Sequence, residues 1–167
     1  MSLITIENGK QIPDILILGI GNILMGDEGV GVHAIRALEK EIFPSTVELL
    51  DGGTGGFHLM AHLEAHPIVI MIDATMDGKP MGTISLIKPR FASDFPSALS
   101  AHDIGLKDMI ESLIILDQLP EIHLFTISIK EIQPMQITLS DEVQAILPQL
   151  RNEVFALVDK ICTSVGA

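Results

Sequence analysis

Cysteine, tryptophan and tyrosine are nearly or wholly absent from this 167-residue chain, and their scarcity excludes several kinds of site. Cys162 is the single cysteine, so the chain cannot form an internal disulfide or a zinc–thiolate cluster. Six Phe residues, with no Trp and no Tyr, offer few rings on which single-stranded bases could stack. We interpret Cys162 as a small residue on a helix face near the C-terminus, without a role in catalysis.

Basic residues are also scarce, at 10 Lys and Arg against 22 Asp and Glu, which gives a net charge of -12. Such a chain repels phosphate backbones and anionic lipids, so we expect no nucleic-acid partner and no membrane association. The apolar run at residues 15–20 is far shorter than the roughly 20 residues of a membrane span. No signal peptide is recognisable at the N-terminus, so a cytoplasmic protein without membrane insertion is predicted.

Hydrophobic residues are abundant, at 47% of the chain against 19% for charged residues, which is enough for a buried core. The length suits one domain, and we expect residues 1–167 to form a single α/β domain with residues 1–13 as a short N-terminal extension. Short apolar runs alternate with longer stretches in which apolar residues recur near every 3.6 positions. This alternation is typical of an α/β fold.

The apolar pattern predicts strands and helices in alternation along most of the chain. Strands are expected at residues 14–19, 47–50, 67–72, 83–87 and 123–129. Helices are expected at residues 29–42, 54–66, 102–119 and 140–163. Thr54 and Ser140 are candidate N-caps, and Pro148 predicts a kink or a break in the last helix. The link before the fourth strand is too short for a crossover helix, so this strand is predicted to be antiparallel. The expected fold class is α/β, a three-layer α/β/α sandwich with a mostly parallel five-stranded sheet.

Carboxylates and one histidine follow the predicted strands at the positions where parallel sheets build their sites. We expect them to converge on one rim of the sheet. They are Asp27, Glu28, Asp51, Asp73, His102 and Asp103. Asn22, in the turn after the first strand, is interpreted as a residue whose side chain hydrogen-bonds local backbone.

Glycine spacing in the same region resembles a dinucleotide-binding fingerprint only in part. Residues 19–24 have a leucine in place of the third glycine, and residues 29–34 restore the spacing but begin inside a predicted helix. Asp51 lies twenty residues after Gly31, where the fingerprint has its acidic residue. However, Asp27 and Glu28 would repel a pyrophosphate at the start of that helix. Dinucleotide binding is therefore a distant alternative, and the glycines are interpreted as tight turns and close helix–sheet contacts.

Conventional protease motifs are missing, because the chain has neither G-x-S-x-G nor H-E-x-x-H. His58, His62 and His66 recur at four-residue steps on a predicted helix, a spacing that can bind zinc. We favour a partly solvated polar stripe, since no carboxylate lies on the same stripe of that helix. His33 and His123 are interpreted as surface or strand-end residues with no visible partners.

Several segments of the chain recur in the same order in a known family. They are ILGIGNILMGDEGVGVHAIRALE at residues 17–39, LLDGGTGGFHL, MIDATMDG, SAHDIGLKDMI at residues 100–110, IQP and LSDEVQAILPQL. Over nearly its whole length the chain resembles the hydrogenase maturation proteases, endopeptidases that trim the large subunit of [NiFe] hydrogenases. The G-x-G-N-x-L-x-x-D-E-G block is the most specific part of this resemblance.

The resemblance implies a mixed α/β sandwich and three side chains that contact a metal. Matched by motif, these are Glu28 of the D-E-G block, Asp73 at the end of the third strand and His102 before the third helix. Two carboxylates and one imidazole suit a first-row divalent ion. The resemblance implies that this ion is nickel already inserted in the hydrogenase precursor, while zinc or cadmium could occupy the site in vitro. The other acidic residues of the rim would have supporting roles.

The expected function is that of a metal-dependent endopeptidase that removes the C-terminal extension of a nickel-loaded [NiFe] hydrogenase large-subunit precursor. Glu28 or Asp73 would act as a catalytic general base. The metal would polarise the scissile carbonyl, activate water, or serve only as a tether, and the sequence leaves these roles open. A nickel-sensing module without peptidase activity is an alternative that uses the same residues. The loop at residues 88–100 is a candidate determinant of which hydrogenase is the client.

Overall fold

A five-stranded sheet forms the centre of the protein, in a computed structural model that describes residues 4–7, 10–96 and 106–164. The strand order is β4-β3-β5-β7-β6, with β6 antiparallel to β7 and the other pairs parallel. The strands are β3 (Ile15–Gly19), β4 (Val47–Asp51), β5 (Ile68–Thr75), β6 (Ile84–Ile87) and β7 (Glu121–Ser128). A separate antiparallel hairpin, β1 (Ile4–Glu7) and β2 (Lys10–Pro13), precedes them. The mostly parallel sheet with an antiparallel edge strand confirms the prediction.

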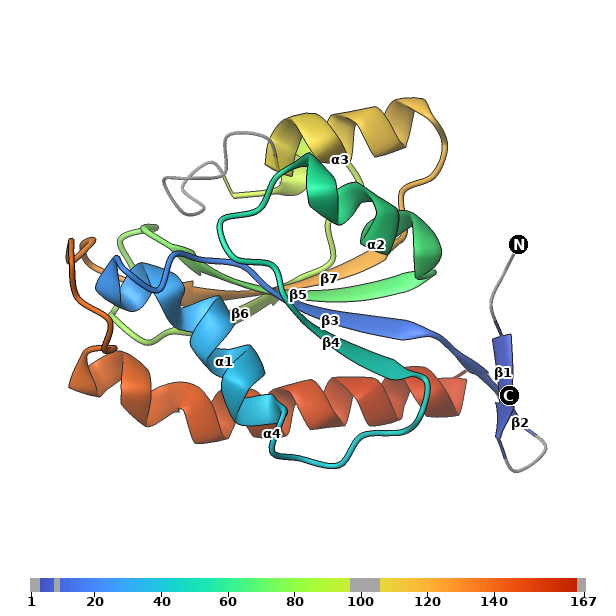
Figure 1. Ribbon diagram of the computed structural model, residues 1–167, viewed down its shortest axis with the longest axis horizontal. Coiled ribbons are helices and arrows are strands. Elements are labelled where there is room, and N and C mark those ends of the chain that lie inside the picture. The colour runs from blue at the N-terminus through green and yellow to red at the C-terminus, as the bar shows by residue number, and fades with distance from the viewer. Residues whose placement is uncertain (1–3, 8–9, 97–105, 165–167) are drawn as a thin grey trace.

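Helices cover both faces of the sheet, as Figure 1 shows. They are α1 (Val30–Leu38), α2 (Met60–Ala65), α3 (Leu106–Ile115) and α4 (Asp141–Ser164), with 3-10 turns η1 (Gly26–Gly29), η2 (Phe57–Leu59) and η3 (Ala92–Asp94). Alternate strand residues divide the core. Ile15 and Ile17 pack with α1 and α4, while Leu16 and Leu18 pack with α2 and α3. These three layers confirm the predicted fold class. None of the helices in the described ranges is both long and apolar enough to cross a bilayer.

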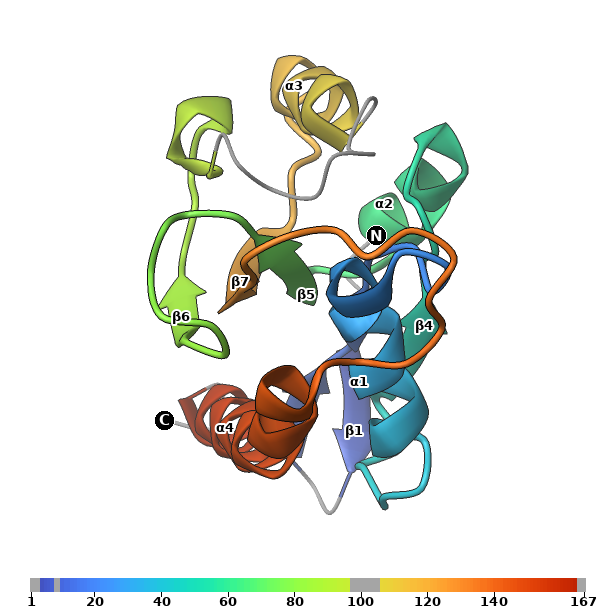
Figure 2. The ribbon, with the colours of Figure 1, turned by 90° about the vertical axis from the view of Figure 1, so that its left-hand side faces the viewer.

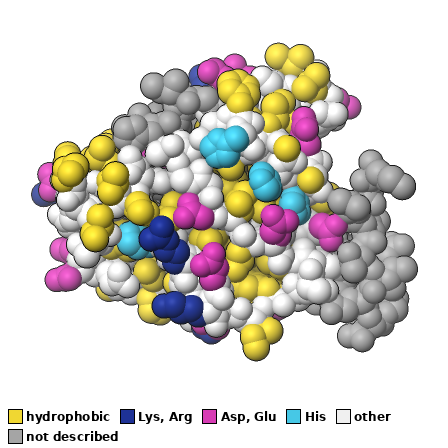
Figure 3. Space-filling view, in the orientation of Figure 1, with side chains coloured by type: hydrophobic (Ala, Val, Ile, Leu, Met, Phe, Trp, Pro, Cys, Tyr) yellow, Lys and Arg dark blue, Asp and Glu magenta, His cyan; other side chains and the backbone are white. Residues whose placement is uncertain are grey.

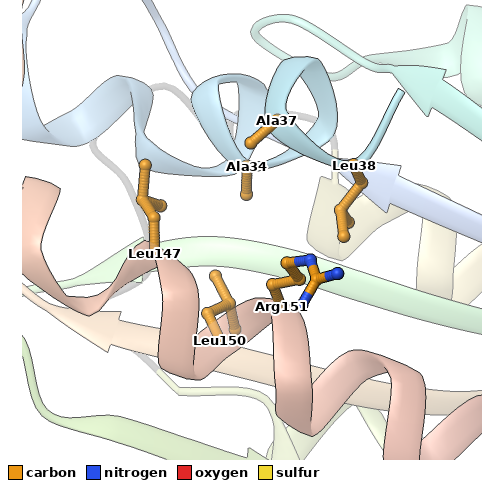
Figure 4. Close-up of a pocket in the computed structure, with 6 residues that line it drawn as sticks. All are labelled: Ala34, Ala37, Leu38, Leu147, Leu150 and Arg151. Carbon is orange, nitrogen blue, oxygen red and sulfur yellow. The ribbon is translucent and has the colours of Figure 1, made fainter. Parts of the chain in front are cut away.

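The contact between α1 and α4 is close because small side chains line it on the α1 side. Figure 4 shows Ala34, Ala37 and Leu38 of α1 opposite Leu147, Leu150 and Arg151 of α4. The free volume between them is about 10 Å³, no more than one water molecule needs. The pair of helices is therefore a packed layer and not a ligand site.

Two glycines bring the start of α1 directly onto the sheet. A Cβ atom on Gly31 would lie 2.2 Å from the Ile20 carbonyl oxygen and 2.3 Å from that of Ile72. A Cβ atom on Gly19 would lie 2.2 Å from the Gly31 carbonyl oxygen. The interpretation of these glycines as close helix–sheet contacts is confirmed. Phosphate groups bind to backbone N–H groups, whereas Gly31 packs against carbonyl oxygens. The glycine spacing at residues 29–34 therefore does not form a phosphate-binding loop here.

Three predicted helix boundaries were wrong, and one of them is the end of the third helix, which lies at Ile115 and not at residue 119. The first helix ends at Leu38, so Ile42 is 92% exposed instead of core-facing. The second helix does not begin at Thr54, because residues 53, 55 and 56 are glycines with φ of 53°, 80° and 116°, outside the helical region. The chain becomes helical only at η2, which leaves Phe57 59% exposed.

The last helix begins within one residue of its predicted start and runs to Ser164 without a break. The Ser140 hydroxyl oxygen accepts a hydrogen bond from the Val143 N–H at 3.4 Å, which confirms Ser140 as the N-cap. Pro148 lies inside one continuous helix, so the expectation of two pieces was wrong. Proline has no N–H, so the Gln144 carbonyl one turn earlier loses its helical hydrogen-bond partner. Both Pro148 and Gln144 are exposed, and water can donate to this carbonyl instead.

Candidate active site

Asp73 lies inside a strand and not after it, which corrects the sequence prediction. Strand β5 runs two residues past Asp73 to Thr75, and the Asp73 residue is 1% exposed. Its side chain alternates with Ile72 and Ala74, which belong to the α1–α4 core, so it points to the α2–α3 side of the sheet. The Asp73 Oδ1 accepts a hydrogen bond from the Ala74 N–H at 2.8 Å.

Buried polar residues surround Asp73 at the carboxyl ends of two neighbouring strands. In the register of β5 and β7, Asp73 is opposite Thr126 and Thr75 is opposite Ser128. All of these residues are at most 2% exposed. Hydroxyl groups at neighbouring positions are hydrogen-bond donors of the kind that can offset part of the hydration lost by a buried carboxylate. Sequence reasoning missed the hydroxyl residues, although their alternation with apolar residues in IHLFTIS was a readable signal.

Glu28 is fully buried in η1, the turn that precedes α1. The Asn22 N–H donates to Glu28 Oε2 at 3.3 Å, and Asn22 Oδ1 accepts from the Leu24 N–H at 2.9 Å, as expected for a turn residue. Gly21 has a φ of 149°, and a Cβ atom there would lie 2.2 Å from the Glu28 carbonyl oxygen. The turn therefore needs glycine at this position to fold tightly around Glu28.

The elements that carry Glu28 and Asp73 lie against each other. The Ile20 N–H donates to the Ile72 carbonyl at 2.9 Å, so the chain leaves β3 beside the strand that carries Asp73, and η1 then packs on β5. His102 and Asp103 lie outside the described residues, and α3 is described from Leu106 onward. Within the described ranges, no group of three His, Cys, Asp or Glu side chains is arranged to hold a metal ion.

Asp27 has a structural role that ties two distant loops together. Its carboxylate accepts hydrogen bonds from the Ser140 N–H at 2.7 Å and from Gln133 Nε2 at 3.1 Å, and its own N–H donates to Gln133 Oε1 at 2.9 Å. Asp27 is fully buried. Gly26, with a φ of 61°, leaves room for Gln133, since a Cβ atom would lie 2.2 Å from Oε1. Gln133 stands in the IQP segment that recurs in the family, but no role was assigned to it from the sequence.

Asp51 lies at the exposed end of the edge strand β4 and does not join the buried carboxylates. Its side chain is 41% exposed and lies 3.8 Å from Arg36 Nη2. Its Oδ1 accepts from the Gly53 N–H at 2.9 Å, which closes a turn. Asp51 therefore lies at the carboxyl edge of the sheet, as predicted, but at an exposed position at the end of the edge strand.

The histidine stripe is only partly helical and has a carboxylate partner from another element. His66 lies beyond the end of α2 and His58 lies in η2. Glu48 of β4 lies 3.1 Å from His66 Nε2 and 3.8 Å from His62 Nδ1. Figure 3 shows histidine side chains in a row on this face, beside acidic ones. The sequence could not reveal this partner, because Glu48 belongs to a separate strand and meets the histidines only in the folded structure.

His33 and His123 have partners, contrary to the sequence interpretation. His123 Nε2 lies 2.8 Å from Glu121 Oε1. Hydrogen bonds from Lys88 and His123 hold the pKa of Glu121 below its usual value, although burial opposes this. Burial, aided by the Arg36 charge, lowers the pKa of His33, against the opposing effects of a hydrogen bond with the Ile137 backbone and of the Asp27 charge.

The lowered pKa of His33 makes folding stability depend on pH. His33 stays neutral in the folded state at pH values where the unfolded chain already binds a proton, so stability is full above about pH 6.5 and falls as pH decreases. We expect urea denaturation to show a smaller loss of unfolding free energy between pH 7.5 and pH 5.5 in His33→Gln than in the wild type. Equal losses in the two proteins would contradict this assignment.

Comparisons with known proteins agree in pointing to one family. The sequence model of the hydrogenase maturation proteases matches residues 32–157. The hydrogenase expression/formation protein HupD of Thiocapsa roseopersicina is 33% identical over 152 residues, which are 88% of this chain and 65% of HupD. The Escherichia coli hydrogenase 2 maturation protease is 33% identical over 145 residues, 85% of this chain and 88% of that protein.

A solved structure gives the same result. The hydrogenase maturating endopeptidase HybD from Escherichia coli superposes with a TM-score of 0.80 at 31% sequence identity, covering 87% of this chain and 92% of HybD. The sheet and the helices on its two faces therefore belong to a common architecture. With the family match over most of its length, this chain belongs to the hydrogenase maturation protease family.

Proposed function

We propose that this protein is an endopeptidase that removes the C-terminal extension of a [NiFe] hydrogenase large-subunit precursor after nickel insertion. The observation that carries the proposal is the burial of Glu28 and Asp73, at 0% and 1% exposure, on elements packed against each other at the carboxyl edge of a parallel sheet. Carboxylates are almost never fully buried without a partner, because losing hydration is costly. The carboxyl edge of a parallel sheet is also where folds of this kind place their ligand sites.

Nickel enters this proposal as part of the substrate. Glu28, Asp73 and His102 would contact the ion carried by the precursor, and oxygen and imidazole donors match a borderline divalent metal. Asp73 faces the sheet side covered by α3, the helix that follows His102 in the chain. The role of His102 rests on its motif position. The single-domain organisation and the cytoplasmic location remain predictions from the sequence.

A buried carboxylate can supply the proton transfers of peptide hydrolysis. As general base, Glu28 or Asp73 takes a proton from water while the water oxygen bonds to the scissile carbonyl carbon. The same group then gives the proton to the amide nitrogen as the C–N bond breaks. The products are the mature C-terminus and a released peptide, so atoms and charge balance.

The test is cleavage of a purified large-subunit precursor, prepared with and without nickel, followed by its electrophoretic mobility. We expect a shift to the mature size with the nickel-containing form alone. Stable binding of that form without cleavage would favour the nickel-sensing module instead. Equal cleavage of both forms would contradict the role of nickel in recognition.

A further inference from the structure

Three exposed apolar side chains form a ridge at the carboxyl edge of the sheet. Leu24, Met135 and Ile137, here called the apolar ridge, are 49%, 87% and 63% exposed. Leu24 follows β3, and Met135 and Ile137 follow β7. Figure 3 shows hydrophobic side chains gathered at the left-hand end of the molecule, and Figure 2 views that end directly. The ridge therefore lies at the same end of the molecule as the buried carboxylates.

Backbone pairing holds the ridge in place. Met25 and Gln136 form a parallel bridge, in which the Gly26 N–H donates to the Gln136 carbonyl at 2.7 Å and the Gln136 N–H donates to the Leu24 carbonyl at 3.2 Å. Two residues further along, the Asp27 carboxylate fixes the same two loops. The ridge is thus built on a rigid support only a few residues from Glu28.

Met135 adopts a backbone conformation that ordinary side chains avoid. Its φ is 61°, in the left-handed region, where a residue with a Cβ atom pays a steric cost. Such strain persists where the surroundings enforce it, and it is frequent at ligand-binding sites. Here it holds a methionine that is 87% exposed, so packing in the core does not explain the residue.

The ridge is also free of charge on an acidic protein. Residues 19–26 and 132–140 contain no Asp, Glu, Lys or Arg, whereas the whole chain carries a net charge of -12. An uncharged surface beside a site can bind apolar side chains without removing water from fixed charges. Long, flexible Met135 suits partners of varied shape.

We propose that the apolar ridge is the docking surface for apolar side chains of the large-subunit precursor, next to the bond to be cut. This inference rests on the proposed function. Docking on the ridge holds the precursor beside Glu28 equally before and during hydrolysis, so it lowers KM and leaves kcat unchanged. The ridge therefore determines how tightly the client binds, and the carboxylates determine whether it is cut.

The experiment compares a variant combining Leu24→Ser, Met135→Ser and Ile137→Ser with the wild type, using the nickel-containing precursor. We expect KM to rise at least about tenfold, with kcat changed less than about twofold. The same substitutions in a Glu28→Gln background should weaken precursor binding about tenfold in calorimetry, equivalent to about 1.4 kcal/mol. Matched controls are Ile42→Ser and Ile115→Ser, at residues that are 92% and 83% exposed elsewhere on the protein.

The possible outcomes separate this inference from the proposed function. Wild-type cleavage together with unchanged KM and affinity in the ridge variant overturns the ridge and leaves the function intact. Failure of the wild type to cleave any nickel-containing precursor overturns the function itself. If sedimentation shows that the ridge variant loses self-association while precursor affinity is unchanged, the ridge binds a second copy of this chain and the proposal is wrong. Met135→Gly tolerates the positive φ and supplies a second variant if the first does not fold, with an expected rise in KM of about threefold.

Discussion

Glu28→Gln is expected to reduce kcat/KM for precursor cleavage at least about a hundredfold. Glutamine has nearly the same shape and keeps an oxygen that can accept the Asn22 N–H, so the turn around it is retained. It lacks the negative charge and the basicity that metal contact and proton transfer require. Single-turnover cleavage of the nickel-containing precursor, followed by electrophoresis, measures the effect.

The matched control is Glu39→Gln, an exposed glutamate directly after α1. It should cleave at the wild-type rate. Thermal unfolding of both variants shows whether each is folded. A Glu28→Gln protein that is folded and fully active would remove Glu28 from the site and leave Asp73 as the remaining candidate base.

The second large effect concerns Asp27, whose replacement by alanine is expected to cost about 3 kcal/mol of unfolding free energy. The substitution leaves the Ser140 N–H and the Gln133 side chain without the carboxylate that they contact at 2.7 and 3.1 Å. These donors lie on loops joined by the same fully buried side chain, so both contacts are lost together. Urea denaturation at pH 7.5 measures the change.

Glu131→Ala is the control for Asp27→Ala, because Glu131 is an exposed acidic residue of the same loop as Gln133. It should change the unfolding free energy by less than about 0.5 kcal/mol. Similar losses of unfolding free energy in Asp27→Ala and Glu131→Ala would mean that the negative charge of the loop, and not the buried hydrogen bonds, stabilises this region.

The layered fold was predictable because its signals are local. The buried runs of β3, β5 and β7 read as strands from composition, and the short link before β6 correctly indicated an antiparallel edge. Helix ends were harder to predict, because apolar spacing does not show where the backbone hydrogen bonds of a helix stop. The apolar pattern of α1 continues to Ile42, although the helix ends at Leu38.

The candidate site was predictable in its carboxylates and not in their support. Asp27 and Glu28 are adjacent in sequence, yet Asp27 binds Gln133 and Ser140 while Glu28 accepts a hydrogen bond from Asn22. The different partners of the two residues depend on the direction in which each side chain points from the turn, and only the three-dimensional structure shows this direction. Glu48 was missed for the same reason, because its contact with His66 crosses from a strand to a helix end.

The strand order β4-β3-β5-β7-β6 has a consequence for how the family can diversify. The connection after β3 leads to β4 at one edge of the sheet, and the connection after β5 leads to β6 at the opposite edge. The two connections therefore diverge between β3 and β5, which is the topological switch point where open α/β sheets bind ligands. Glu28 belongs to the first connection, and Asp73 lies near the end of β5, where the second begins. The segment between β6 and α3 carries neither carboxylate, so we expect that it can change in length on either side of His102 while Glu28 and Asp73 keep their positions.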